Sequence, residues 1–172
     1  MNPWMTTRER RSPEAPVATR VRIFIPREPG RVFDYLADLR NEPNYNRQVS
    51  GICKTSPGPI GQDTTFEGSH RGFGRVTWRL SEYDRPKHVA IEGGVGQGAY
   101  RWISDFEPAG GGTWMTGTME WQPTPRWRPF RGLLGVILHM NARRSFRRMA
   151  RVLQADGSLG SESAGAIERP AD

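Results

Sequence analysis

Three side chains in the middle of the sequence are candidates for acid–base chemistry: His70, Arg79 and Tyr100. A histidine that points into a cavity can transfer protons near neutral pH. Such chemistry requires at least two titratable groups within hydrogen-bond reach of one ligand position, and His70 with Tyr100 or Arg79 is the pairing to test. No acidic partner for His70 is evident in the sequence. A purely structural histidine is the alternative, and the catalytic residues stay unassigned.

The sequence gives no sign of a metal or phosphate site. His70, His88 and His139 lack metal-ligand spacing, and Cys53 is the single cysteine, so we expect neither a metal nor another cofactor, and no intrachain disulfide. The segment 93–98 (GGVGQG) lacks the lysine and the following helix that phosphate-binding loops require. We interpret it as a flexible loop. The sequence also lacks the Gly-x-Ser-x-Gly pattern of many hydrolases.

Length and composition predict one domain with polar ends. The chain has 172 residues, of which 20 are glycine and 14 are proline, and so many turn formers favour a strand-rich body. The ends are polar, and we expect a disordered leader over 1–16 and a disordered tail over 155–172. No apolar run approaches the ~20 residues of a membrane span, and the N-terminus lacks the hydrophobic segment of a signal peptide. We therefore expect a cytoplasmic protein.

The positive charge is concentrated near the C-terminal end. The net charge is +7, and residues 122–155 contain eight arginines and no acid. Such a segment can attract nucleic acid, anionic lipid or an acidic ligand. We prefer a solvated helix face and do not expect nucleic acid as a partner; binding to nucleic acid would weaken steeply with salt.

Aromatic and basic residues alternate over 126–131 (RWRPFR), between Arg126 and Arg131. Tryptophan beside cations is typical of a membrane interface, so this segment could contact an anionic membrane peripherally. In the alternative, which we slightly prefer, Trp127 and Phe130 fold back over a sheet edge.

A long helix over 130–153 is the strongest element in the sequence. One stripe has the spacing of a helix face, and its members are Leu134, Leu138, Ala142, Ser145, Phe146, Met149, Val152 and Leu153. Arginines occupy the opposite side of the second half. The first half is apolar all round, so it must be enclosed, line a cavity, or meet a membrane or partner.

Strands and two short helices precede that helix. We expect helices over 28–39 and 41–47, and strands over 17–25, 49–55, 63–71, 75–83, 88–92, 99–107 and 113–122. Closely spaced strands with short turns predict an antiparallel meander. The fold class is therefore α+β, with a curved antiparallel sheet wrapped around the long C-terminal helix.

Several short motifs resemble the START-like (SRPBCC) superfamily, specifically its polyketide cyclase/dehydrase and lipid-transport branch. They are PGRVFDYLAD (29–38), Ile60-Gly61, RLSEYDRP (79–86), Gly112-Thr113 and the C-terminal helix. The resemblance covers about 17–154. It implies a single helix-grip domain over that range, with a deep hydrophobic cavity between sheet and long helix.

Members of the branch bind lipids, sterols, polyketides or other apolar ligands, and some cyclise or aromatise polyketides. This sequence has Asn44-Tyr45-Asn46 where the branch usually has a tryptophan-containing segment. It has Tyr83 and Val49 where aromatase/cyclase members place an arginine and a tyrosine. The resemblance therefore favours binding, or transport, of a hydrophobic molecule or lipid. A polyketide cyclase/aromatase-type lyase that uses the same cavity is the alternative.

Strand alternation indicates which side chains face the long helix. Those expected to bind the ligand are Phe66, Trp78, Tyr100, Trp102, Met115, Met119 and Trp121 from the strands, with Leu134 and Leu138 from the helix. Aromatic and methionine side chains suit an adaptable apolar pocket. Ordinary core packing is the alternative for each of them.

Overall fold

The computed structural model describes residues 16–71, 74–95 and 98–164. Almost all of the predicted leader, and the last part of the predicted tail, lie outside these ranges. The elements in chain order are β1 (Val17–Ile25), α1 (Pro29–Ala37), η1 (Leu39–Asn41), α2 (Glu42–Tyr45), β2 (Val49–Lys54), β3 (Thr65–His70), β4 (Gly74–Asp84), β5 (His88–Val95), β6 (Gly98–Ala109), β7 (Gly112–Pro123), η2 (Pro125–Phe130) and α3 (Arg131–Ala164).

The seven strands form one antiparallel sheet in the order β1-β7-β6-β5-β4-β3-β2. Strands β2 to β7 form the expected meander, and β1 joins the free edge of β7, with Val17 opposite Trp121 and Ile25 opposite Thr113. Side chains alternate between the two faces. In β4, Val76, Trp78 and Leu80 are buried. The alternation predicted from the sequence is therefore confirmed.

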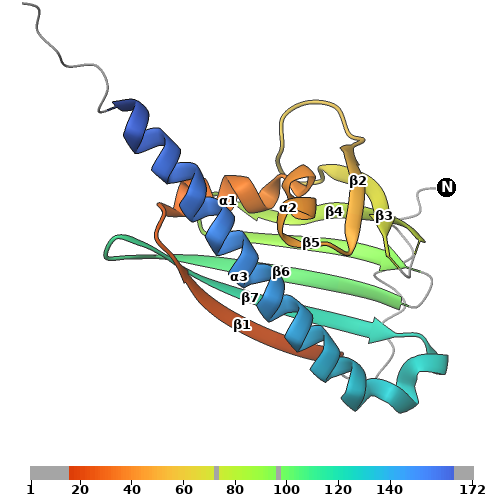
Figure 1. Cartoon of the computed structure of the whole chain (residues 1–172). Helices are drawn as coiled ribbons and strands as arrows, with labels where there is room; N and C mark the ends of the chain where they lie inside the picture. Colours follow the sequence, from red (N-terminus) through yellow and green to blue (C-terminus); the bar gives the residue numbers. More distant parts are fainter. Residues whose placement is uncertain (1–15, 72–73, 96–97, 165–172) are drawn as a thin grey trace, which may run out of the picture.

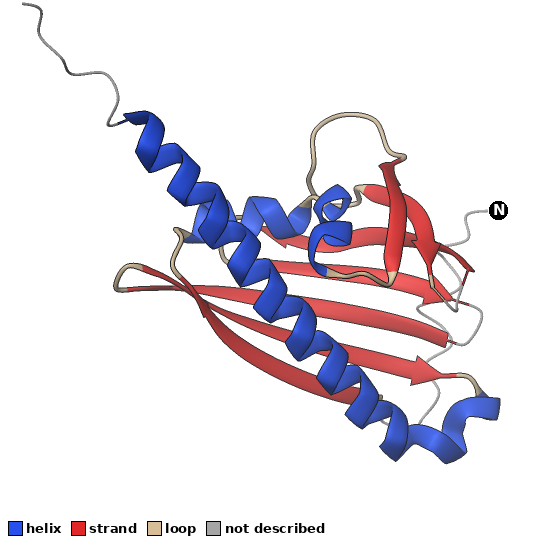
Figure 2. Ribbon diagram, viewed as in Figure 1, coloured by secondary structure: helices blue, strands red, loops and turns tan. Residues whose placement is uncertain are grey.

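All three α-helices lie on the same side of the sheet in the view of Figures 1 and 2. Helix α1 starts at Pro29, which suits a first turn, and it buries Val32, Phe33 and Leu36. Helix α3 crosses the strands diagonally (Figure 2). The predicted α+β helix-grip architecture, with short helices after the first strand, is confirmed.

The part of α3 between Ala142 and Leu153 is fastened to the sheet. Its buried residues are Ala142, Phe146, Met149, Ala150 and Leu153. The Phe146 ring meets the Trp102 ring edge-on at 5.0 Å between centroids. Arg27, just after β1, donates hydrogen bonds to the backbone carbonyls of Leu153 (2.8 Å) and Gln154 (3.0 Å). The helix is therefore firmly held near Leu153.

Three differences from the prediction are larger than two residues. Helix α3 continues to Ala164, so the predicted tail from 155 begins inside a helix. Strand β5 continues to Val95, where we expected a flexible loop, because Gly93 pairs with Tyr100 of β6. A Cβ at Gly93 would lie 2.5 Å from the Tyr100 ring, so only glycine leaves room for that ring. The segment before α3 is the 3₁₀ helix η2.

A network of ion pairs covers the sheet face opposite the helices. His88 lies between two carboxylates, with Nδ1 2.7 Å from Asp105 and Nε2 2.8 Å from Glu82. Burial acts to lower the pKa of His88, but the hydrogen bonds and charges of Asp105 and Glu82 outweigh it and raise that pKa. Both ring nitrogens can donate only when the imidazole is protonated. The network therefore favours the charged histidine.

Candidate functional site: an apolar cavity beneath the long helix

A cavity of about 320 Å³ lies between the sheet, α2 and the first half of α3. This is within the range of small-molecule sites. The sheet contributes Trp78, Ile91, Tyr100, Trp102, Met119 and Trp121, and α3 contributes Leu134, Ile137, Leu138, Asn141, Ala142, Ser145 and Phe146. The remaining lining comes from Leu36, Leu39, Glu42, Tyr45, Asn46, Gln48, Val49, His70 and Arg71. Most of this surface is aromatic or aliphatic.

Most of the predicted ligand-binding side chains line this cavity: Trp78, Tyr100, Trp102, Met119, Trp121, Leu134 and Leu138. Phe66 and Met115 do not. Both point to the helix side of the sheet, as predicted, but both are completely buried in the core. Met115 pairs with Ile23 and Phe106, far along β7 from Trp121. Alternation predicts the face of a residue but not its position along the strand, which explains the error.

Arg79 does not belong to the cavity. It lies on the opposite face, where it forms ion pairs with Asp63 (2.8 Å) and Glu92 (2.9 Å). Arg79 follows Trp78 directly in β4, and successive side chains of a strand point to opposite faces of the sheet. The pairing of His70 with Arg79 around one ligand is therefore wrong on geometry.

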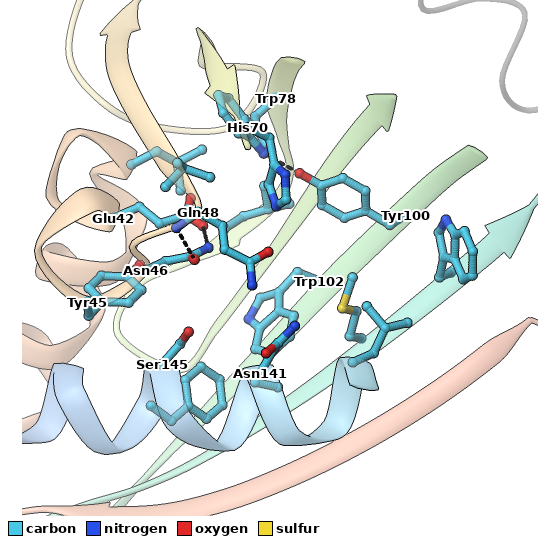
Figure 3. A pocket seen from close by; sticks show the side chains of 18 of the residues that line it. Glu42, Tyr45, Asn46, Gln48, His70, Trp78, Tyr100, Trp102, Asn141 and Ser145 are labelled. Carbon is cyan, nitrogen blue, oxygen red and sulfur yellow. Dashed lines mark hydrogen bonds between the residues drawn. The ribbon is translucent and has the colours of Figure 1, made fainter. Parts of the chain in front are cut away.

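His70 and Tyr100 do line the same cavity. The Nδ1 atom of His70 lies 2.9 Å from the backbone oxygen of Arg71, and burial lowers the pKa of the imidazole. The Tyr100 hydroxyl accepts a hydrogen bond from the indole nitrogen of Trp78 (Figure 3). Burial, with a contribution from the charge of Glu42, raises the pKa of Tyr100 well above its usual range. Tyr100 therefore stays protonated at physiological pH.

Glu42 is the acidic site residue that the sequence did not reveal. It is the first residue of α2 and lines the cavity. Asn46 Nδ2 donates a hydrogen bond to its Oε1 atom at 2.8 Å, and the Asn46 Oδ1 atom accepts from the backbone nitrogen of Gln48 at 3.1 Å (Figure 3). Burial raises the pKa of Glu42 to about 7, although the Asn46 hydrogen bond opposes the shift.

The signal for Glu42 in the sequence is weak. An acid in the first turn of a helix, next to Pro43, ordinarily lies in water and complements the helix dipole. Here α2 packs against both α3 and β2, so its first turn faces the interior. Among the described residues, no cation forms an ion pair with Glu42.

The outer side of the first half of α3 carries an apolar stripe, which consists of Leu133, Val136, Ile137 and Met140 and is 43% to 63% exposed. Ile137 also lines the cavity. Trp127 and Phe130 pack on each other with ring centroids 6.4 Å apart, and they are 39% and 54% exposed. Both rings are therefore available at the surface, whereas the alternative preferred from the sequence has them folded back over a sheet edge.

The described part of the chain offers neither a membrane-spanning helix nor a metal site. No helix there has an apolar stretch long enough to cross a membrane. No three histidine, cysteine or acidic side chains among the described residues are grouped so that they could hold a metal ion. The third histidine of the sequence, His139, has its Nδ1 atom 2.8 Å from the Thr19 hydroxyl.

Comparison with known proteins supports the same fold. The family model described as "Polyketide cyclase / dehydrase and lipid transport" matches residues 16–154. TTHA0849 from Thermus thermophilus is similar in structure, with a TM-score of 0.65 and 19% identity over 81% of this chain and 98% of that one. No curated protein matches the sequence.

Two other similar structures have lower sequence identity. The di-domain ARO/CYC StfQ from the steffimycin biosynthetic pathway has a TM-score of 0.68 and 12% identity, over 84% of this chain and 52% of StfQ. Ara h 8.0201 has a TM-score of 0.61 and 13% identity, over 80% of this chain and 97% of that one. At such identities the likeness concerns the fold.

Proposed function

Because the chain belongs to the polyketide cyclase/dehydrase and lipid transport family, we propose that it binds a hydrophobic small molecule in the cavity beneath α3. The observation that carries this proposal is the cavity itself, which is lined mostly by aromatic and aliphatic side chains from both the sheet and the helix. Its volume of about 320 Å³ lies near the lower end of the usual range for ligand sites. A compact ligand therefore fits better than a two-chain lipid held entirely inside.

We also propose that the protein binds peripherally to an anionic membrane. The contact would be made by the apolar stripe and by segment 126–131, which contains Arg126, Trp127, Phe130 and Arg131. Exposed apolar side chains next to arginines suit the interface between water and lipid, where aromatic rings and cations are both favoured. Ile137 belongs to the stripe and to the cavity wall. A ligand could therefore pass between the bilayer and the cavity along this side of α3.

A cyclase-type enzyme that uses the same cavity is the second candidate. The observation in its favour is that titratable groups, among them Glu42, His70 and Tyr100, line one apolar cavity. Proton transfer to or from a bound polyketide would require two of them to reach the same ligand atoms. The Tyr100 hydroxyl already accepts a hydrogen bond from Trp78, so Glu42 and His70 are the pair to test for activity.

The test of the binding proposal uses two matched tryptophan substitutions on α3. Leu138→Trp fills the cavity, whereas Leu133→Trp adds the same ring to the exposed side of the helix. Native mass spectrometry of the purified protein first identifies co-purifying small molecules. We expect L138W to lose bound ligand and to bind an apolar naphthalene probe at least tenfold more weakly, and L133W to behave like the wild type. Equal binding by all three proteins would refute the proposal.

A further inference from the structure

We propose that Glu42 anchors the polar end of the ligand, so that the cavity selects an apolar molecule with a hydrogen-bond donor, a hydroxyl or an ammonium group, at the end that faces α2. This inference rests on the proposed binding function and specifies the chemistry of its ligand. It concerns recognition, and it holds for a carrier and for an enzyme alike.

The first argument is the unused hydrogen-bonding capacity of the carboxyl group. An ionised carboxylate has two oxygens with about four acceptor sites. Asn46 donates one hydrogen bond to Oε1. Among the described residues, no other side chain donates to Glu42 and no cation pairs with it. The Glu42 side chain is half-buried and borders the cavity. A ligand that displaces water from this carboxylate must therefore offer it a hydrogen-bond donor, because an unpaired polar group is costly once it is buried.

The second argument is the position of Glu42 in the cavity. Figure 3 shows Glu42, Asn46 and Gln48 together on the α2 side, and Tyr100 and Trp102 on the sheet side. The Asn46 side chain orients Glu42 and is itself held in place. Its amide nitrogen donates a hydrogen bond to Glu42, and its amide oxygen accepts one from the backbone nitrogen of Gln48. The cavity is therefore apolar along most of its wall, and its one carboxylate lies with two amide side chains on the α2 side. The other polar lining residues are His70, Arg71, Asn141 and Ser145. An amphiphilic ligand matches this division.

The third argument concerns the other ionisable groups near Glu42. Helix α3 contributes Asn141 and Ser145 to the cavity, neither of which titrates. Around α2, η1 and the cavity the titratable or charged groups are Tyr35, Arg40, Tyr45, His70, Arg71 and Tyr100. Arg40 is paired with Asp38. Burial raises the pKa of Tyr45 and Tyr100 and lowers that of His70, so it favours the neutral form of all three. Glu42 is the carboxyl group that borders the cavity, and burial raises its pKa to about 7.

The experiment compares three probes with the same ring: 2-naphthol, 2-methoxynaphthalene, and 2-(aminomethyl)naphthalene as its ammonium ion. Affinity is measured by quenching of the cavity tryptophans. Proton exchange is measured by calorimetry at pH 7 in buffers with different ionisation heats. We expect 2-naphthol to bind about tenfold more tightly than its methyl ether, since hydrogen bonds to charged groups are strong. Its binding should release protons, because a donor favours the carboxylate.

The variant Glu42→Gln removes the charge at almost constant shape, and should abolish both the preference for 2-naphthol and the proton release. Glu107→Gln is the matched control, because Glu107 is an exposed carboxylate that pairs with Arg22. This variant should behave like the wild type. The ammonium probe distinguishes the two donor classes: a preference for it over 2-naphthol identifies a cationic ligand, and the reverse order identifies an alcohol.

Two results would overturn the inference in different ways. If the wild type binds the alcohol and the ether equally, or if E42Q keeps the preference, the anchor is wrong while the binding function stands. If no probe binds to the wild type and L138W gives identical data, the binding function itself is wrong, and the anchor with it.

Discussion

The Phe146 ring on α3 lies directly against the backbone of Gly117 on β7. A Cβ atom at residue 117 would lie 2.4 Å from Cζ of that ring and 2.8 Å from the Trp102 ring, well inside normal contact distance. Phe146 and Trp102 also line the cavity. This contact therefore sets how closely the helix approaches the sheet, and it marks the end of the cavity toward the fastened part of α3.

We expect Gly117→Ala to destabilise the protein by about 1–3 kcal/mol, because one methyl group must displace two packed rings. Urea unfolding measures the change in the free energy of unfolding. Gly94→Ala is the control, since a Cβ there has no atom within 4 Å. An equal loss in both variants would show that the backbone, and not the Phe146 contact, is responsible.

Glu42→Gln should make the protein more stable above neutral pH. The folded-state pKa of Glu42 is raised to about 7, whereas an unfolded glutamate has a pKa of about 4.3. The carboxylate therefore disfavours folding increasingly as pH rises from about 4.5 to 7, by up to ~4 kcal/mol at 1.36 kcal/mol per unit. We expect E42Q to gain stability at pH 8 and to match the wild type at pH 4.5. A gain that does not change with pH would contradict this explanation.

His88→Gln should cost more stability at pH 6 than at pH 8. The folded-state pKa of His88 is raised despite its burial, so its stabilising contribution is complete below the unfolded value of about 6.5 and is lost as pH rises through the folded value. Partial exposure keeps the difference on the order of 1 kcal/mol. Thermal unfolding between pH 5.5 and 8 measures it. For His70→Gln, where burial lowers the pKa, the pH dependence should have the opposite sign.

Gly132→Ala should stiffen the N-terminal end of α3. A Cβ at this position has no atom within 4 Å, and alanine gains about 1 kcal/mol over glycine in a helix. If this end moves when ligand passes, we expect G132A to release 2-naphthol more slowly in stopped-flow experiments. The equilibrium affinity for 2-naphthol should remain nearly the same. An unaltered release rate would show that the ligand leaves by another route.

Membrane docking predicts that Leu133→Asp and Val136→Asp each weaken binding to vesicles that contain phosphatidylserine by about tenfold. Both side chains are more than half exposed on the apolar stripe, and a charge there opposes insertion while it repels anionic lipid. Co-sedimentation with vesicles at increasing salt concentration measures the electrostatic contribution to membrane binding. Phe24→Asp, on an exposed position of β1, is the control. Equal binding to neutral and anionic vesicles would exclude the charge-assisted mode.

Much of the cavity wall could be predicted because strands alternate with a period of two and helix faces repeat every three to four residues. This is why the sequence orients Trp78, Trp102 and Leu138 correctly. The period of two does not reveal that Met115 lies outside the cavity. That depends on where along β7 the helix α3 separates from the sheet, which the alternation of side chains does not indicate. Glu42 escapes prediction because its burial comes from the packing of α2 against α3, and no local pattern records such a contact.

The hydrogen bonds from Arg27 to α3 affect how the helix can move. Arg27 holds the carbonyls of Leu153 and Gln154, while Arg131 begins the helix ~33 Å away at ~1.5 Å per residue. The N-terminal part of the helix can therefore rotate about the contacts near Leu153. A rotation of only about 5° there would carry the far end through about 3 Å over that length. The wall formed by Leu134 and Leu138 can shift by ångströms with little change at the contacts around Leu153, provided that the contact between His139 and Thr19 (2.8 Å) opens.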